Sequence, residues 1–496
     1  MNHLKVLDSH GNKIPASHLS SAYEGATFGR RLGTWGAYSS GPNTALFSSL
    51  STLRARSREL TRNNPLSHGA VDSFVANLIG TSISPRWQIK DSELKEKIQE
   101  LWIDSIEEMD ASGLCDFYGM QSIVARALIE GGECLVRFRM RKPDDGLIVP
   151  MQLQVIEGDH LDETYSTIAP NGNEIRMGIE INKAGQRVAY WLYNEHPGEN
   201  FVNTNHIERV RIPASEILHI YRPLRPGQMR GRPWMASIIV KMHEIDQCVD
   251  AELVRRKTTA MFGGFITRPP GEDEESGILG KTVEDNADME RIIALEPGTF
   301  PELPPGYGVN FSMPTDVSGN YVAWMKQQLR DIARGIGVTY EQLSGDLEGV
   351  NYSSIRAGLL EFRRLCKMIQ IHTLVFQLCK PVAKRWLDTA VLCGAIEIPD
   401  YSKNRRIYNR IKWCPDGWDW VDPLKDQHAK LMAVRGGFES RAHVVAEMGH
   451  DIEIVDNEIT EDLKRTDKLG LVLDSDPRKT AGSGSMQTMQ TMQKIE

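Results

Sequence analysis

The chain has 496 residues, of which 41% are hydrophobic and 25% charged, and its formal net charge is −8. This length accommodates about three domains with sizeable cores. The composition excludes wholesale disorder, collagen and a small disulfide scaffold, and the negative net charge excludes a generally basic nucleic-acid binder. We expect no secretory signal and no membrane-spanning helix, because the start lacks an apolar region and no apolar run reaches ~18 residues. The seven cysteines form no C-x-x-C pair, which is typical of reduced thiols in a cytosolic fold.

Charge is distributed unevenly along the chain. Residues 1–68 carry eight basic residues and three acidic ones. Residues 353–390 carry seven basic residues and two acidic ones. Residues 271–301 carry nine acidic residues against Lys281 and Arg291. Blocks of opposite sign suggest different partners for different regions, although any one block alone is more simply a solvated face.

The N-terminal third begins with a segment that has no core of its own. The first 45 residues are rich in Gly, Ser and small polar groups and predict a flexible basic arm. Helical periodicity follows over residues 48–79, with an interruption at Pro65. Further helices are expected over residues 94–109 and 121–130.

A period of two then predicts a half-buried antiparallel sheet. Two runs joined by a turn at 142–146 place apolar side chains on one face, namely Val136, Phe138, Met140, Met151, Leu153 and Val155. A second pair of strands is expected over 175–181 and 188–192, around a turn at 182–185. Arg137, Arg139 and Arg141 share the other face of the first strand, which favours an exposed sheet edge over contacts to phosphate.

Two long amphipathic helices flank the acidic block. The first begins at Pro233 and runs out near Gly263, and the second follows Ser318 and stops at Gly335–Gly337. Their apolar stripes consist of Met235, Ile238, Met242, Ile245, Val249 and Leu253, and of Met325, Leu329, Ile332 and Ile336. As antiparallel neighbours, these helices would form a stalk with the acidic insertion, about residues 265–314, at its tip.

A glycine-containing loop over 344–352 precedes a third long helix, which Ser353 or Ser354 can cap and Pro381 should kink or end. Its expected buried stripe is Ile355, Leu359, Phe362, Cys366, Ile369 and Phe376, and its polar stripe is Arg356, Arg363, Lys367 and Gln370. A Trp- and Pro-rich segment, 413–423, leads to a helical region over 424–468. The tail from residue 482 is expected to be flexible.

Chemical motifs are few. Gly280-Lys281-Thr282 resembles the end of a phosphate-binding P-loop, but Glu275 stands where that motif needs a further glycine, so we reject it. Trp413, Trp418 and Trp420 could stack on bases, but a packed structural turn is the better interpretation. The sequence contains no zincin or hydrolase motif and no cluster with metal-ligand spacing, so we expect no catalytic site, cofactor or metal.

Several segments in order resemble the lambda-type portal proteins of tailed bacteriophages and prophages. They are LRARSRELTRNNPLSHGAVDSFVANLIGT (53–81), GGECLVR (131–137), QVIEGDH (154–160), DIARGIGV (331–338), LSGDLEGVNYSSIRAGLLEFRR (343–364) and PLKDQHAKLMAVRGGFESRAHVVAEMG (423–449). No single segment is a chemical signature, but their ordered occurrence along nearly the whole chain is specific.

The resemblance implies a mixed α+β, predominantly helical portal fold with wing, stem, clip and crown, assembling as a dodecameric ring. The implied regions are a flexible arm (1–45), a wing (46–230), a first stem helix (231–260), an acidic clip (261–316), a second stem helix (317–338), a tunnel loop (339–352), a channel-bordering helix (353–393), a linker (394–423), a helical crown (424–475) and a flexible tail (476–496).

The resemblance also implies a function and its residues. The ring would form the channel for double-stranded DNA at one capsid vertex of the virion, after assembly in the bacterial host cytoplasm. The tunnel loop would project Gly345, Asp346, Leu347, Glu348, Gly349, Val350, Asn351 and Tyr352, and the bordering helix would present Arg356, Arg363, Arg364 and Lys367. The clip would dock the terminase large subunit and later a head–tail connector through Glu272, Asp273, Glu274, Glu275, Glu284 and Asp285. Further partners would be the major capsid protein and the scaffold.

The physics of a conduit agrees with this interpretation. Double-stranded DNA carries one negative charge per ~1.7 Å of axis, so a strongly basic bore would grip it. Acidic residues in the loop and a few cations on the helix would instead let it slide. Two alternatives stay open, namely a packaging-associated ATPase or nuclease, and a ring-forming connector or scaffold through which no DNA passes.

Overall fold

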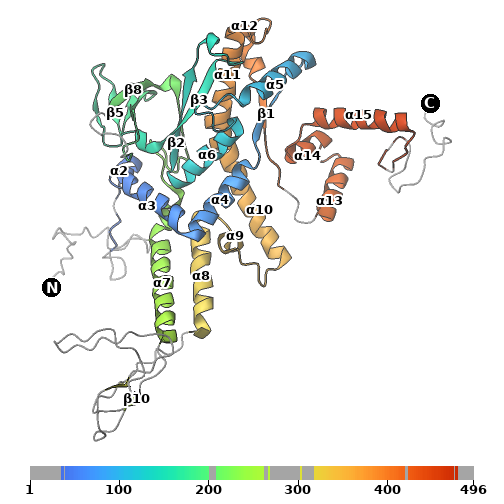
Figure 1. Ribbon diagram of the computed structural model, residues 1–496. Coiled ribbons are helices and arrows are strands. Elements are labelled where there is room, and N and C mark those ends of the chain that lie inside the picture. The colour runs from blue at the N-terminus through green and yellow to red at the C-terminus, as the bar shows by residue number, and fades with distance from the viewer. Residues whose placement is uncertain are drawn as a thin grey trace, which may run out of the picture.

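The computed structural model describes residues 35–37, 39–199, 208–261, 266–267, 302–303, 318–418, 423–473, 475–476 and 478. A body of helices and sheets carries two long helices that project from it, and three C-terminal helices lie to one side (Figure 1). The predicted mixed and predominantly helical fold is confirmed.

The N-terminal helices follow the predicted pattern. Helix α2 (Pro42–Phe47) is followed by α3 (Leu50–Asn63) and α4 (Pro65–Ile79), so the predicted interruption at Pro65 is confirmed. The break is fixed by Asn64, whose side-chain oxygen accepts hydrogen bonds from the first amides of α4. Helices α5 (Ser92–Ile106) and α6 (Phe117–Glu130) confirm the next two predictions, with starts shifted by a few residues.

The first sheet has the order β3-β2-β9. Strand β2 (Glu133–Met140) pairs antiparallel with β3 (Met151–Glu157), with Val136 opposite Val155, as the sequence predicts. The edge-strand interpretation of the arginine row is wrong, because β9 (Ile217–Tyr221) pairs with the other side of β2. Arg137 forms an ion pair of 3.4 Å with Glu216, and Arg139 donates to Gln154 at 2.6 Å.

The second sheet has five strands, β4 (Thr167–Ile168), β5 (Glu174–Arg176), β6 (Ile179–Ile181), β7 (Arg187–Tyr193) and β8 (Arg209–Pro213). The single strand predicted over 175–181 is wrong, because Met177 and Gly178 have φ of 50° and 81° and reverse the chain between β5 and β6. The alternating pattern continues across this tight turn and therefore hides it. The predicted turn at 182–185 is confirmed between β6 and β7.

A tryptophan cluster joins distant parts of the chain in the main core. Strand β1 (Ile83–Trp87) pairs antiparallel with β12 (Ile411–Pro415). Beneath this ribbon, the Trp102 ring lies 5.7 Å from Trp87 and 4.9 Å from Trp386, measured between centroids. All three side chains are fully buried. Such contacts stabilise a core beyond the area that they bury.

A buried ionic cluster forms a second anchor of the body. The Glu133 carboxylate, fully buried, accepts hydrogen bonds from Arg230, Arg54 and His219 at 2.5, 3.1 and 3.0 Å, and one from the Gly231 amide. Burial works against the charged form, but the Arg230 charge and the His219 hydrogen bond hold the pKa of Glu133 well below its usual range. Burial lowers the pKa of His219 to about 4.

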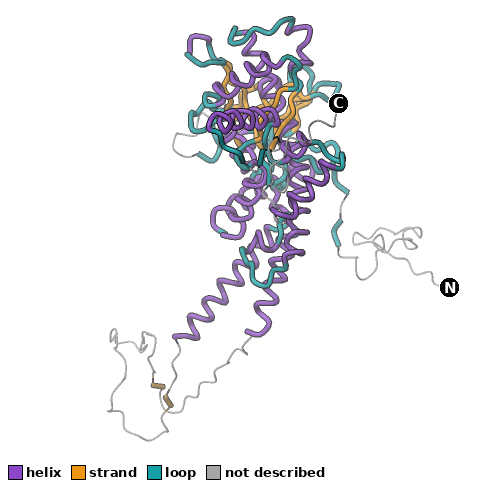
Figure 2. Tube along the Cα trace, turned by 90° about the vertical axis from the view of Figure 1, so that its right-hand side faces the viewer, coloured by secondary structure: helices purple, strands orange, loops and turns teal. Residues whose placement is uncertain are grey.

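The two projecting helices form the antiparallel stalk that the sequence predicts. Helix α7 (Ile239–Met261) leaves the body and α8 (Ser318–Ile336) returns beside it (Figure 2). Lys241 forms an ion pair of 2.6 Å with Asp331. A short 3-10 turn, Trp234–Ser237, precedes α7, so the predicted α-helical start at Pro233 is a few residues early. Leu253, placed in the buried stripe, is 48% exposed.

Strands β10 (Ile266–Thr267) and β11 (Glu302–Leu303) are the described parts of the segment between α7 and α8. They pair in parallel. The proposed acidic docking residues and the Lys281 motif lie outside the described residues.

The third long helix is continuous but irregular. Helix α10 (Tyr352–Ile369) passes through a π-helix (Gln370–Cys379) into α11 (Lys380–Leu392). Pro381 does not end the helical path; it occupies the first turn of α11, where its missing amide is tolerated. The wider π turn shifts the helical periodicity. For this reason Phe376, predicted buried, is 64% exposed. Gln370, expected on the polar stripe, is buried and donates to the Leu78 carbonyl at 2.9 Å.

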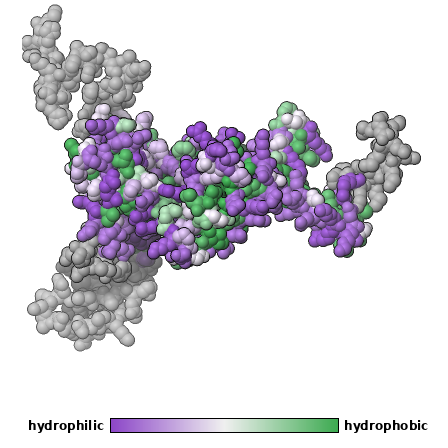
Figure 3. Space-filling model, turned by 90° about the horizontal axis from the view of Figure 1, so that it is seen from above, coloured by the Kyte–Doolittle hydropathy of each residue, from purple (hydrophilic) through white to green (hydrophobic). Residues whose placement is uncertain are grey.

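Helix α12 (Tyr401–Tyr408) precedes β12, and the C-terminal helices α13 (Pro423–Arg435), α14 (Arg441–Glu447) and α15 (Ile452–Leu469) confirm the predicted helical region. We call residues 423–473 the C-terminal unit. It forms the coloured lobe at the right of Figure 3, whose upper face is mainly hydrophilic. Among its described side chains, none that is apolar is buried.

Candidate functional site

The loop between α8 and α10 starts from a short helix that the sequence analysis missed, α9 (Tyr340–Ser344). Thr339 and Gln342 form a capping box, in which each side chain accepts from the other's backbone amide. Leu343 anchors this helix in the core, with 4% of its surface exposed. The Thr-x-x-Gln spacing is the sequence signal that could have predicted α9.

Asp346 holds the base of the loop. Its carboxylate accepts hydrogen bonds from the Tyr340 hydroxyl at 2.9 Å and from the Glu348 amide at 2.9 Å, and Lys326 lies 3.0 Å away. The Glu348 amide, Lys326 and Tyr340 lower the pKa of Asp346 to about 2. Asp346 is therefore an anion that fixes the loop to α8 and α9, and its charge is largely balanced by Lys326.

The tip of the loop is open. Leu347 is 66% exposed, and Glu348 and Gly349 are also exposed. Gly349 has a φ of 69°, a left-handed conformation that favours glycine, and a Cβ there would meet open space. A single acidic side chain, that of Glu348, thus stands at an exposed and conformationally defined tip, and Val350 and Asn351 lead back to α10.

Helix α10 begins at Tyr352 and is capped by Asn351, which accepts the Ser353 amide at 3.0 Å. The predicted caps, Ser353 and Ser354, are wrong because they lie two and three positions after Asn351. Along the helix that follows, residues three and four apart share a face.

Three of the four basic residues expected on α10 share a face, because Arg356, Arg363 and Lys367 are spaced by seven and four residues. Arg356 forms an ion pair of 2.6 Å with Asp426 of α13, and the Arg363 guanidinium lies 5.8 Å from the Trp418 ring centroid. Arg364 and Lys367 are exposed. The Lys430 hydrogen bond and the Lys367 charge lower the pKa of Glu447 in α14. This face of α10 is therefore turned toward the C-terminal segment.

The tryptophans of the Trp- and Pro-rich segment have structural contacts. Trp413 and Trp418 pack against the core, as the structural interpretation predicts. The Trp418 indole also donates to the Asn77 side chain at 3.0 Å. Trp420 lies outside the described residues.

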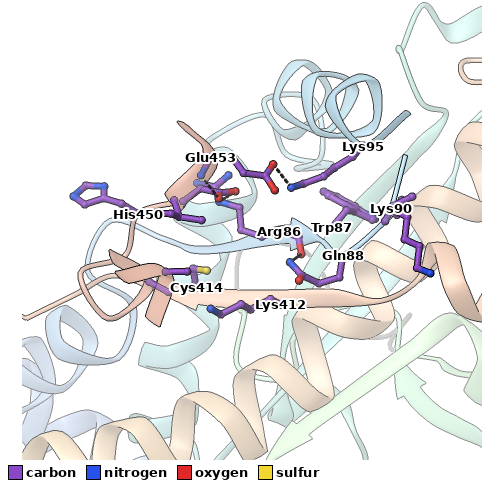
Figure 4. Close-up of a pocket in the computed structure, with 14 residues that line it drawn as sticks. Arg86, Trp87, Gln88, Lys90, Lys95, Lys412, Cys414, His450 and Glu453 are labelled. Atoms are coloured by element: carbon purple, nitrogen blue, oxygen red, sulfur yellow. Dashed lines mark hydrogen bonds and ion pairs between the residues drawn. The ribbon is translucent and has the colours of Figure 1, made fainter. Parts of the chain in front are cut away.

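A pocket of ≈ 300 Å³ lies where the body meets the C-terminal unit (Figure 4). Arg86 of β1 lies 3.4 Å from Asp451, and Lys95 of α5 pairs with Glu453. The ion pairs of Arg86 and Lys95 join α15 to the body. Lys90 and Lys412 also line the pocket, as do Cys414 and His450, between whose side chains no hydrogen bond is described.

One group in the described residues has the spacing of metal ligands, namely Glu157, Asp159 and His196. Arg58 occupies it, because its guanidinium lies 3.1 Å from Glu157 and 2.6 Å from Asp159. Burial raises the pKa of Asp159, but the Arg58 hydrogen bond and the Arg54 charge lower it overall. A cation already balances these carboxylates, so the residues do not fit a metal ion.

None of the described helices combines the length and the apolar character that crossing a membrane requires. This agrees with the expectation from the sequence.

The chain was compared with known families and proteins. Residues 28–370 match the family model described as phage portal protein, lambda family. The probable portal protein of Halomonas phage phiHAP-1 is 33% identical over 439 residues, which cover 85% of this chain and 81% of that protein. The portal protein of Escherichia phage N15 is 24% identical over 501 residues, and portal protein B of Escherichia phage lambda is 23% identical over 486; each match covers 89% of both chains.

Among solved structures, a chain from the neck of an empty GTA particle aligns with a TM-score of 0.42 and 15% identity, covering 84% of this chain and 95% of that one. A chain from the virion of the native gene transfer agent aligns with a TM-score of 0.38 and 15% identity, covering 84% and 94%. The family model matches most of the chain, and the Halomonas phage portal protein is 33% identical over most of both chains. This protein therefore belongs to the lambda family of phage portal proteins.

Proposed function

We propose that this portal protein forms a homododecameric ring at one vertex of the capsid and that the loop at 345–351 faces its central channel. Double-stranded DNA would pass through this channel during packaging and ejection. The observation that carries the proposal is the loop itself, whose tip is exposed at Leu347 and Glu348 while Asp346 fixes its base. A closed ring repeats one such loop in every copy.

The charges of this region suit passage without tight binding. Repetition around the ring turns Glu348 into an acidic ring that repels phosphates. Arg364 and Lys367, exposed on α10, would supply a limited number of cations for guidance. A bore lined mainly by cations would instead bind DNA strongly through counterion release, with affinity that depends on the phosphates rather than on base sequence.

We assign the remaining regions as follows. Residues 46–230 would be the wing, 231–260 and 317–338 the two stem helices, the acidic segment 261–316 the clip, and 424–475 the crown. Residues 353–393 would be the channel-bordering helix and 394–423 the linker to the crown. The clip would dock the terminase large subunit and then a connector through its acidic residues, and the wing would contact the capsid protein and scaffold. The antiparallel stalk supports this assignment, because α7 and α8 project together from the body (Figure 1).

We propose a structural rather than catalytic role, in the virion after assembly in the host cytoplasm. Cys414, His450 and Asp451 line one pocket, but no hydrogen bond between their side chains is described, and burial raises the pKa of the Cys414 thiol. Arg58 already balances the one metal-like cluster among the described residues. ATP hydrolysis by a P-loop would use a phosphate-binding lysine. ATP turnover that disappears in Lys281→Ala would favour the ATPase alternative and overturn the structural role.

The loop can be tested by replacing residues 345–351 with a Gly/Ser linker of equal length. Rings should still form, because the Asp346 contacts and the Asn351 cap that the replacement removes lie within one copy and the tip residues are exposed. The amount of DNA packaged or retained per particle should fall. The matched control replaces the exposed β6–β7 turn, residues 182–186, in the same way, and packaging should persist. Normal packaging with the 345–351 replacement would favour the connector alternative and contradict a channel-facing loop.

The charge at the tip is tested separately with Glu348→Lys and Glu348→Gln. We expect Glu348→Lys to slow packaging more than Glu348→Gln, because it creates a ring of cations that attracts phosphates, and we expect the difference to shrink at high salt. Equal rates for the wild type and Glu348→Lys at low salt would show that the tip does not meet DNA.

A further inference from the structure

The segment that follows β9 is rich in arginine. Residues 222–232 read RPLRPGQMRGR and contain four arginines and no acidic residue. Arg230 binds the carboxylate of the buried ionic cluster at 2.5 Å, and Arg225 donates to a backbone carbonyl at 3.2 Å. Arg222 and Arg232, by contrast, form no ion pair within the part of the chain that the structure describes. Two of the four positive charges in this segment are therefore not balanced by a described carboxylate.

The two unbalanced arginines line one small cavity at the root of the stalk. Its volume is ≈ 90 Å³, and no acidic residue is among those described in its lining. The rest of the lining is apolar or glycine, namely Phe74, Leu224, Trp234, Gly335, Ile336 and Leu365. Since Trp234 belongs to the turn before α7 and Ile336 ends α8, the cavity lies where both stalk helices join the body.

The two guanidinium groups are close enough to repel each other. Burial lowers the pKa of Arg222, and the charge of Arg232 lowers it further. The Arg222 guanidinium lies 5.9 Å from the Trp234 ring centroid, a contact that offsets only part of a positive charge. Like charges that are partly withdrawn from water are costly unless an anion accompanies them. The electrostatics of the cavity therefore favour a negatively charged occupant.

The donors at this cavity indicate what kind of anion fits. Arg232 Nε and Trp234 Nε1 are buried and have no hydrogen-bond partner among the described residues, which is unusual for buried N–H groups. The guanidinium fork matches the paired oxygens of a carboxylate or a phosphate. Pockets for cofactors and similar ligands measure about 300–1,000 Å³, so a cavity of ≈ 90 Å³ is too small for a nucleotide.

We propose that Arg222 and Arg232 bind one oxyanion in this cavity, either a free phosphate ion or the carboxylate of an acidic side chain of an adjacent copy. The oxyanion joins the segment after β9 to the turn before α7, and so holds the root of the stalk against the body. A phosphodiester within duplex DNA is flanked by sugars that this cavity does not admit. The site lies within one copy and does not depend on the ring of the proposed function.

Titration of the dissociated full-length protein with inorganic phosphate tests the site. Calorimetry should give one phosphate per chain, and the midpoint of thermal unfolding should rise with phosphate at constant ionic strength. Arg222→Gln and Arg232→Gln should each weaken this binding by about tenfold or more, because each removes charge-assisted hydrogen bonds. The matched control Arg225→Gln changes an arginine of the same segment that does not line the cavity, and it should bind phosphate like the wild type.

The unbalanced charges give a second readout. Without phosphate, Arg222→Gln should unfold at the same temperature as the wild type or at a higher one, because the substitution removes the repulsion between the two guanidinium groups. With phosphate, the wild type should become the more stable of the two. A midpoint that falls equally in both buffers would show that Arg222 stabilises the fold without an anion, and would overturn the site.

Assembled rings distinguish the two sources of the oxyanion. Phosphate binding to rings and to dissociated subunits alike assigns the site to the free ion. Binding to dissociated subunits alone assigns it to a carboxylate of the adjacent copy, which must then lie between the two guanidinium groups in a resolved ring.

Three results overturn the proposal, namely no phosphate binding to subunits, equal weakening by Arg222→Gln and Arg225→Gln, or a neutral group in the cavity of the ring. If the wild type forms no rings with its assembly partners, the proposed function fails, whereas the titration of subunits still decides the oxyanion site.

Discussion

The body and the C-terminal unit use the same kinds of residues to opposite effect. In the body, fully buried side chains such as Trp102, Trp386 and Phe74 form one continuous core, and even the charged Glu133 is completely enclosed. In the C-terminal unit no described apolar side chain is buried. The difference teaches that the body contains a core that can stabilise it within one subunit, whereas the described residues of the unit form no such core.

The largest effect is expected from removing the buried charge of the body. Glu133→Gln leaves Arg230 and Arg54 without their buried carboxylate, which should lower the free energy of unfolding by about 3–5 kcal/mol. Chemical denaturation of the dissociated subunit, or the soluble yield if the variant does not fold, measures this. The control Glu130→Gln, whose partly exposed carboxylate pairs with Arg126 at 3.0 Å, should cost at most about 1 kcal/mol. Equal costs would contradict the anchoring role.

The next effect compares one leucine in each region. Leu374→Ala removes a fully buried side chain from the π-helix and should cost about 2–5 kcal/mol of subunit stability. Leu431→Ala in the C-terminal unit should change subunit stability by less than about 0.5 kcal/mol. Similar losses of unfolding free energy for Leu374→Ala and Leu431→Ala in the dissociated subunit would contradict the distinction between the two regions.

Lowering the pH should reduce the stability of the body through protonation of His219 in the unfolded chain. Burial lowers the folded-state pKa of His219 to about 4, below its value of 6.5 in the unfolded chain. Between these values the unfolded chain binds a proton that the folded body does not, so stability falls as the pH decreases from about 6.5 to 4. The variant His219→Gln should lose this part of the pH dependence. An unchanged slope of unfolding free energy against pH in that window would exclude His219 as its source.

The smallest effect is expected at the joint between the two regions. Asp426→Asn weakens the partly exposed ion pair with Arg356 and should cost about 0.2–1 kcal/mol, less at high salt. Hydrogen exchange should become faster in α13 and remain unchanged in the tryptophan core. Faster exchange throughout the body would mean that the two regions unfold together.

Local patterns in the sequence predicted many of the elements. The break at Pro65, the β2–β3 hairpin, the stalk and the C-terminal helices all follow from periodicity and turn residues close together in the chain. The pairing of β1 with β12 could not be predicted, because its partners are more than 300 residues apart and neither strand shows which edge it joins. The π-helix was missed for a related reason: no residue signals the switch in hydrogen bonding that exposes Phe376.

The candidate site was predicted in part. The loop and its exposed tip follow from its glycines and Asn351, which caps α10. Periodicity placed Arg356, Arg363 and Lys367 on one polar stripe. It could not show that Arg356 would pair with Asp426 or that Arg363 would lie over the Trp418 ring. The role of Asp346 as a fixed anion depends on Lys326, which lies on the preceding long helix. Such contacts arise from tertiary packing and are invisible to spacing along the chain.

The most direct test is a symmetric reconstruction of the assembled protein by electron cryomicroscopy, with the bore resolved. We predict a closed ring in which Leu347 and Glu348 of every copy border the channel. A ring whose 345–351 loops point away from the bore, or a chain that remains monomeric together with its capsid and scaffold partners, would contradict the account.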